Sequence, residues 1–86
     1  MRLTTHDGRP AKRQPNGKYC ASSRNGRNWD VSKEQYFDTE ADLIAAVEAD
    51  PQLSVRMQSP KDNYKRGNAF VASKLLVDGK PLVGKT

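Results

Sequence analysis

The sequence predicts a single small α+β domain in which one helix packs on an antiparallel sheet, in the order β-β-α-β-β-β. Three observations predict this class. An Asn-Gly pair at 25–26 separates two strand-like runs, a capped helical pattern covers 39–49, and short apolar runs divided by turn residues fill the rest. A chain of 86 residues has room for one core. We therefore expect one domain, 18–86, preceded by a basic arm, 1–17.

The first 17 residues carry little that could form a core. They contain two prolines and four basic residues, and Leu3 is their only large aliphatic side chain. Segments of this composition bury too little apolar surface to offset the entropy lost on ordering. We therefore expect residues 1–17 to form a flexible basic arm.

Residues 18–32, KYCASSRNGRNWDVS, predict a β-hairpin with a type I′ turn at Asn25-Gly26. In this register Arg24 lies opposite Arg27 and Cys20 lies opposite Val31. The face that we expect in the core then carries Cys20, Trp29 and Val31, and the other face carries Tyr19, Ala21, Asp30 and Ser32. In that position Cys20 is a small buried hydrophobic residue.

The segment DTEADLIAAVEADP, 38–51, predicts a helix over Thr39–Ala49. Thr39 with Asp42 three residues later approximates a capping box, and the acids near the start complement the positive helix N-terminus. Pro51 disfavours helical geometry at Asp50 and ends the element. The apolar stripe consists of Leu43, Ile44 and Val47.

Two further regions follow the helix. LSVRM, 53–57, alternates apolar and polar residues as a half-buried strand does, and the composition of 58–68 is that of a loop. Residues 69–83 leave two alternatives. Asp78-Gly79 between apolar runs predicts a second hairpin with Leu75 facing Leu82, which we favour, whereas Asn68 would instead cap a helix that stops near Gly79.

The last eight residues, GKPLVGKT, match the G-x-x-x-x-G-K-T pattern of a phosphate-binding loop. Such a loop works because a following helix directs its positive end at the phosphates. Here Gly79 falls in a predicted hairpin turn, and the sequence supplies no helix after the motif. We therefore expect Gly79–Thr86 to match by coincidence and not to bind a nucleotide.

Reactive side chains are scarce. Cys20 is the only cysteine and His6 the only histidine, so the sequence predicts neither a cysteine-based zinc site nor a nucleophile paired with a base. We expect no enzyme activity, no cofactor and no metal. No run approaches the ~20 apolar residues of a membrane span, and no secretory signal is visible, so we expect a cytoplasmic protein without a membrane partner.

Charge divides the sequence into three parts. The net charge is +5, yet residues 1–28 hold seven bases against one acid, 29–50 hold seven acids against one base, and 51–86 hold seven bases against two acids. This asymmetry predicts separate positive and negative surfaces.

The leading hypothesis is nucleic-acid binding by the hairpin tip and by the basic loop KDNYKRGN, 61–68. Arginines at the tip of a β-ribbon can straddle phosphates, and a ring among cations can stack on a base. The structural alternatives are tip arginines that are merely solvated and a loop tyrosine anchored to its own domain. The candidate residues are Arg24, Arg27, Lys61, Tyr64, Lys65 and Arg66.

The alternative function is a protein-interaction module, such as a small inhibitor or accessory factor of a phage or other mobile element. Acids along the helix would meet a basic partner or imitate a phosphate backbone. An exposed sheet edge would instead join copies of the chain into a homo-oligomer. The candidate partner-binding residues are Asp38, Glu40, Asp42, Glu48 and Asp50.

One resemblance accompanies these hypotheses. The layout of GKY, NGR and FDTEADLIAAV between Gly17 and Asp50 resembles the arm-type DNA-binding domains of phage integrases, which share an F-x-T-x-x-E/D step into the helix. Phe37, Thr39 and Asp42 occupy those places. The resemblance covers about two-fifths of the chain and implies a three-stranded sheet with one helix that binds DNA. The sequence departs from it in its two further expected strands and its acidic helix start.

Overall fold

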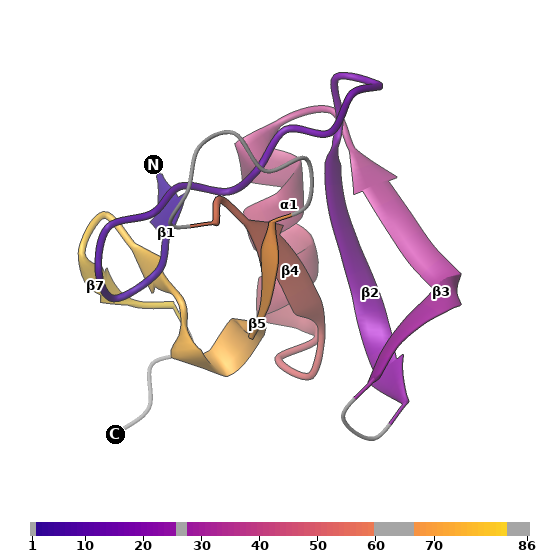
Figure 1. The fold of residues 1–86 in the computed structure, drawn as a ribbon. Helices are drawn as coiled ribbons and strands as arrows, with labels where there is room; N and C mark the ends of the chain where they lie inside the picture. The colour runs from indigo at the N-terminus through magenta and orange to yellow at the C-terminus, as the bar shows by residue number, and fades with distance from the viewer. Residues whose placement is uncertain (1, 26–27, 60–66, 83–86) are drawn as a thin grey trace.

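The computed structural model describes residues 2–25, 28–59 and 67–82 (Figure 1). In these residues the chain forms seven strands, one α-helix and one short 3₁₀ turn. The elements in chain order are β1 (Leu3–Thr4), β2 (Tyr19–Asn25), β3 (Asn28–Phe37), α1 (Glu40–Ala49), β4 (Ser54–Met57), β5 (Asn68–Val71), η1 (Ala72–Lys74), β6 (Leu76–Val77) and β7 (Lys80–Pro81). The predicted α+β class, with one helix and antiparallel strands, is confirmed.

The strands form two antiparallel sheets. The larger has the order β3-β2-β4-β5 and the smaller the order β1-β6-β7. In Figure 1, α1 lies behind the larger sheet and the smaller sheet lies to the left. The core lies on the α1 side, where the helix residues Leu43 and Val47 join the strand residues Ala21 and Val55, all buried. The opposite face of the larger sheet, which we call the outer face, carries the alternate side chains of the same strands.

The helix begins and ends where the sequence predicts. Thr39 caps α1, because its Oγ1 accepts a hydrogen bond from the Asp42 amide at 3.1 Å. Asp50 is the residue that ends the helix, directly before Pro51. The expected apolar stripe is buried at Leu43, Ile44 and Val47.

The first predicted hairpin is present, but its predicted register is wrong. Asn25 pairs with Asn28, and Arg24 pairs with Trp29 rather than with Arg27. A turn centred on Asn25-Gly26 requires Arg24 and Arg27 as the last pair before the turn. The last pair in the structure is Asn25 with Asn28, one residue later in each strand.

A bulge in β3 then changes the register further. Arg24 pairs with Trp29, whereas Ser22 pairs with Glu34. From one of these pairs to the other, β2 advances by two residues and β3 by five, so β3 contains extra residues. The extra residues are held by side chains: the Ser22 hydroxyl donates to the Asp30 carbonyl at 2.5 Å, and the Asp30 carboxylate accepts from the Ser32 amide at 3.0 Å. Such bulges bend a strand and redirect its side chains.

The faces of this hairpin are also opposite to the expectation. α1 packs on the face of β2 that carries Ala21, so Ala21 is in the core and Cys20 lies on the outer face. Arg56 follows the core residue Val55 in β4, so its side chain points to the outer face. Trp29 stacks on Arg56 and therefore lies on the outer face as well. Val31, in the bulge, is 71% exposed. The prediction that Cys20, Trp29 and Val31 face the core is wrong.

The N-terminal segment packs against the domain. Leu3 is fully buried, and β1 pairs with β6 so that Leu3 lies opposite Val77. Farther on, Ala11 is buried in the core and pairs with Met57 of β4. This packing departs from the expectation of a flexible arm over 1–17. The segment is held by the burial of Leu3 and Ala11 and by pairing with β6 and β4, which its composition does not reveal.

The second predicted hairpin is confirmed. β6 and β7 are antiparallel neighbours, and the Leu82 amide donates to the Leu75 carbonyl at 3.1 Å, as predicted. Asp78 and Gly79 both have positive φ angles, 54° and 83°, which a type I′ turn requires. The alternative helix is reduced to the single 3₁₀ turn Ala72–Lys74.

Candidate nucleic-acid interface

Most of the predicted nucleic-acid contacts fall outside the described residues. Arg24 belongs to β2 and pairs with Trp29 through its backbone. The positions outside the described part are Arg27, Lys61, Tyr64, Lys65 and Arg66, together with the side chain of Arg24. Of the phosphate-loop pattern, Gly79 is a turn residue and 83–86 lie outside the described part.

The strand ends that flank these segments lie at opposite ends of the larger sheet. Residues 26–27 join β2 to β3, and residues 60–66 lie between β4 and β5, beyond the Met57–Asn68 pair. Because β4 runs antiparallel to β2, the Met57–Asn68 pair lies beside the first residues of β2. The β2–β3 connection follows the last residue of β2. At about 3.3 Å per residue, the length of β2 separates the two ends by about 20 Å.

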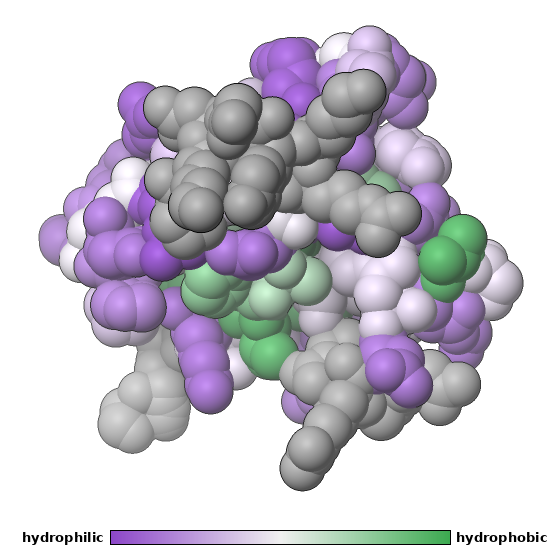
Figure 2. Space-filling model, viewed as in Figure 1, coloured by the Kyte–Doolittle hydropathy of each residue, from purple (hydrophilic) through white to green (hydrophobic). Residues whose placement is uncertain are grey.

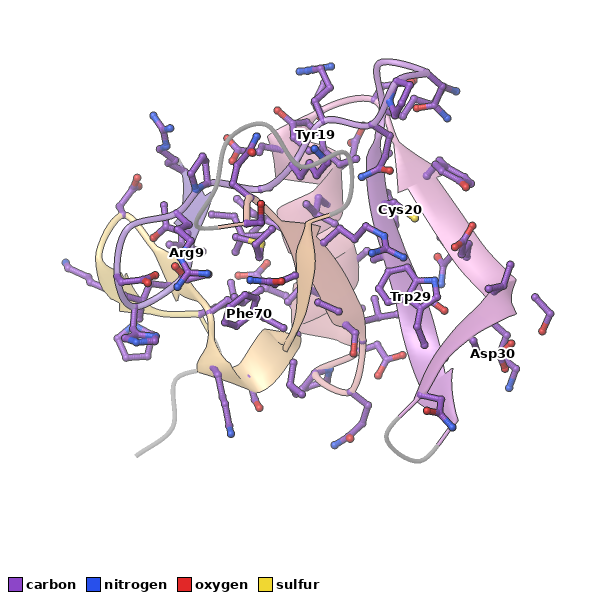
Figure 3. All side chains as sticks on the ribbon, viewed as in Figure 1. Arg9, Tyr19, Cys20, Trp29, Asp30 and Phe70 are labelled. Atoms are coloured by element: carbon purple, nitrogen blue, oxygen red, sulfur yellow. The ribbon has the colours of Figure 1, made fainter. Side chains whose placement is uncertain are left out.

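Between these ends, an arginine lies on an aromatic ring on the outer face. The Arg56 guanidinium carbon is 4.4 Å from the centre of the Trp29 ring, and its Nη1 donates to the Gly67 carbonyl at 3.3 Å. The pair bridges β2, because β2 lies between β3 and β4 in the sheet. Figure 3 shows the Trp29 ring in front of β2. The outer face therefore presents a cation on a flat apolar surface.

One carboxylate fixes both Trp29 and a second aromatic ring beside it, that of Tyr36. Glu34 accepts a hydrogen bond from the Trp29 indole N–H at 2.7 Å and another from the Tyr36 hydroxyl at 2.8 Å, one on each carboxylate oxygen. Tyr36 is 47% exposed, so its ring is oriented and yet open to solvent. We call Trp29, Glu34, Tyr36 and Arg56 the aromatic cluster.

The hydrogen bonds within the aromatic cluster shift the pKa values of Glu34 and Tyr36. Donation from Trp29, and next from Tyr36, lowers the pKa of Glu34 below its ordinary value of 4.5. The hydrogen bond to Glu34 raises the pKa of Tyr36 to about 12, because removing the phenol proton would break it. At neutral pH Glu34 is therefore charged and Tyr36 is neutral, which is the state that keeps both hydrogen bonds.

Cys20 lies beside the cluster and is buried, as the sequence predicts. Burial, and next the negative charge of Glu34, raise the pKa of its thiol. A protonated and enclosed thiol is a poor nucleophile. The position of Cys20 therefore fits a packing role, and Figure 3 shows it between β2 and β3.

Two basic residues of the N-terminal segment lie at the Met57 end of the sheet. The Lys12 amide donates to the Arg56 carbonyl at 3.0 Å. The Arg13 guanidinium carbon is 4.7 Å from the centre of the Tyr19 ring, and its Nη2 donates to the Tyr19 hydroxyl at 3.1 Å. Sequence reasoning missed this placement, because only the pairing of the segment with Met57 brings these cations to the sheet.

The acidic residues proposed to bind a protein partner do not form one uninterrupted surface. Three of them have partners within the chain: Asp38 with the Lys18 ammonium (3.4 Å), Glu40 with the Leu3 amide (3.4 Å) and Asp50 with the Gln52 amide (3.1 Å). Asp42 and Glu48 are exposed on α1. Asp38 is also exposed despite its ion pair, so three of the five acids are open to a partner, whereas Glu40 and Asp50 are half-buried.

Within residues 2–25, 28–59 and 67–82, no three His, Cys, Asp or Glu side chains lie close enough together to hold a metal ion. In the same residues no helix is long and apolar enough to cross a bilayer. No protein-family model, no curated protein and no solved structure matches the chain.

Proposed function

We propose that the chain is a small non-enzymatic binding module that engages nucleic acid through its larger sheet. Cations at both ends of the sheet would hold phosphates, and a loop tyrosine would stack on a base. The residues in these roles are Arg24 and Arg27 at the hairpin, and Lys61, Tyr64, Lys65 and Arg66 between β4 and β5. The observation that carries the proposal is the Trp29–Arg56 stack on the outer face between the two ends.

The spacing of the two ends suits an extended polyanion. Their separation of about 20 Å corresponds to about six base steps at 3.4 Å each. A small anion would meet cations at one end alone, whereas a strand or duplex would meet both. Lys12 and Arg13 add positive charge at the Met57 end.

The placement of the helix also favours this binding mode. Asp42 and Glu48 are exposed on α1, which packs on the core side of the larger sheet. The sheet therefore separates these acids from the outer face. A polyanion on the outer face would meet the Arg56 guanidinium before it met the helix acids.

The test is a fluorescence-anisotropy titration of the purified chain with duplex DNA, single-stranded DNA and RNA at ~50 and ~200 mM salt. Binding should weaken steeply with salt, with a slope of about −0.9 per phosphate contact on duplex DNA. Replacing Arg24 and Arg27 together with alanine should make this slope shallower by about two.

The matched control replaces two other cations. Lys74 and Lys80 are exposed near the smaller sheet, so K74A/K80A removes the same charge without touching the larger sheet. We expect this variant to keep the slope of the parent chain. Binding that is insensitive to salt, or equal losses in both double variants, would contradict the proposal. Absence of binding at low salt would direct the search to basic proteins that contact Asp42 and Glu48.

A further inference from the structure

The outer face is broader than a groove of duplex DNA. Four strands about 4.8 Å apart span about 14 Å between the first and last backbones, whereas the major groove is about 12 Å wide. Figure 2 shows this side of the molecule, where a weakly hydrophobic surface over β4 and β5 is bordered by hydrophilic residues. Base edges inside a duplex therefore cannot reach Arg56 in the middle of the sheet. A base reaches the aromatic cluster only when it is free of the duplex.

The exposed ring of the cluster is already oriented for stacking. The Tyr36 hydroxyl is fixed by Glu34 at 2.8 Å, while 47% of the residue remains exposed. Trp29 is held by the same carboxylate and is covered on one ring face by Arg56. Little side-chain entropy is left to lose when a flat ligand settles on such rings.

Glu34 also decides which side of a nucleic acid faces the cluster. Its carboxylate is charged at neutral pH and accepts hydrogen bonds from both rings, so it would repel a phosphate placed next to it, whereas Arg56 would attract a phosphate on its own side of Trp29. Bases carry no such charge. A strand that crosses the outer face is therefore expected to turn its bases inward and to leave its phosphates to cations nearer the ends of the sheet.

From this geometry we infer that the outer face binds single-stranded nucleic acid, with a base stacked on the Tyr36 ring beside the Trp29–Arg56 pair. The inference rests on the proposed function and narrows it to one form of ligand. The competing mode is a duplex held by the projecting β2–β3 hairpin, because a two-stranded ribbon is narrow enough for the major groove.

The experiment uses the full chain and its only tryptophan, Trp29. The probes are an oligothymidylate and a DNA hairpin duplex with the same number of phosphates. We expect the oligothymidylate to bind more tightly and to change Trp29 emission, because it settles beside that ring. Y36A should weaken oligothymidylate binding by about 5- to 150-fold, the range expected for one base–aromatic stack.

Two variants separate stacking from other effects. Y36F keeps the ring but loses the hydrogen bond that orients it, so it should lose much less oligothymidylate binding than Y36A. Q35A changes the neighbouring exposed residue, whose side chain points to the other face of β3, and should bind unchanged. Thermal melts show whether each variant is folded, and the emission change of the unsubstituted chain tests the inference without any variant.

The outcomes distinguish this inference from the proposed function. Tighter duplex binding that is lost in R24A/R27A, with Y36A unaffected, overturns the inference and leaves nucleic-acid binding in place. Oligothymidylate binding without any change in Trp29 emission also overturns it. If neither probe binds at low salt, both the inference and the proposed function fail.

Discussion

At the scale of single residues, Glu34 organises the outer face. Its two oxygens accept hydrogen bonds from rings that are seven positions apart, Trp29 and Tyr36. The bulge in β3 allows this contact because it bends the strand between them. A charged acceptor strengthens both hydrogen bonds relative to a neutral one.

Replacing Glu34 with glutamine should remove an acid titration of Trp29 fluorescence. The hydrogen bonds lower the pKa of Glu34 in the folded protein, so its contribution to stability is complete above its ordinary value of 4.5 and is lost as the pH falls through the lowered value. Emission of the parent chain should therefore change below pH 4.5. E34Q has no carboxylate to protonate and should lack this step.

Glu48 supplies the control for that titration, because it is an exposed acid of α1. E48Q should keep the acid step in Trp29 emission. An unchanged step in E34Q would assign it to another group, and Asp30 is the nearest acid to Trp29 in the sequence.

The aromatic residue that the sequence predicts as a binding residue differs from those that the structure places on the outer face. The sequence favours Tyr64 because it stands among cations, and the predicted hairpin register places Trp29 on the face expected in the core. Neither Tyr36 nor Arg56 was a candidate. Their meeting with Trp29 depends on three strands and a bulge, and no local pattern encodes a contact between β3 and β4 across β2.

At the scale of elements, α1 shows what local signals can specify. Its start depends on one side chain, because Thr39 Oγ1 accepts from the Asp42 amide at 3.1 Å. T39A should therefore destabilise the domain by about 1 kcal/mol and lower its Tm by about 4–8 °C. T39S keeps an oxygen in the same place and should melt close to the parent chain. A T39A melting curve that coincides with the parent curve would show that the cap contributes nothing.

The first hairpin shows that local sequence signals can predict a turn without predicting the register of its strands. An Asn-Gly pair predicts that the chain reverses near 25–26, and the chain does reverse there. The predicted register is wrong because hydrogen bonds inside the bulge set the actual one. The Ser22 hydroxyl donates to the Asp30 carbonyl, and the Ser32 amide donates to the Asp30 carboxylate. Counting residues from a turn assumes a regular ladder, and β3 is not regular.

At the scale of the whole molecule, the N-terminal segment is part of the core. Leu3 is fully buried, so L3A should cost about 2–5 kcal/mol. A domain of this size is expected to have a total stability of about 4–13 kcal/mol, so the loss should be a large fraction of it. Urea denaturation followed by Trp29 fluorescence would measure it.

Arg2 provides the control for that measurement, because its side chain is exposed next to Leu3. R2A should leave the urea midpoint within the experimental error of the parent value. If residues 1–17 formed a flexible arm, both L3A and R2A would be neutral.

The packing of this segment could not be predicted from the sequence for a physical reason. Leu3 acquires its partner from β6, at the other end of the described chain. Composition and periodicity describe neighbours along the chain, whereas this pairing depends on how the two sheets close around α1. The fold class was predictable because helix caps and turns are local, and the joining of the sheets was not.

The pairing of β1 with β6 has a consequence for the protein during its synthesis. The Arg2 amide and the Asp78 carboxylate that it contacts are 76 positions apart. A ribosome that adds about 5–20 residues per second needs about 4–15 s to make that length. Leu3 therefore leaves the ribosome well before its partner strand β6 and stays unpaired during that interval. Until β6 emerges, a nascent chain of this protein has an unclosed core that a chaperone can reach.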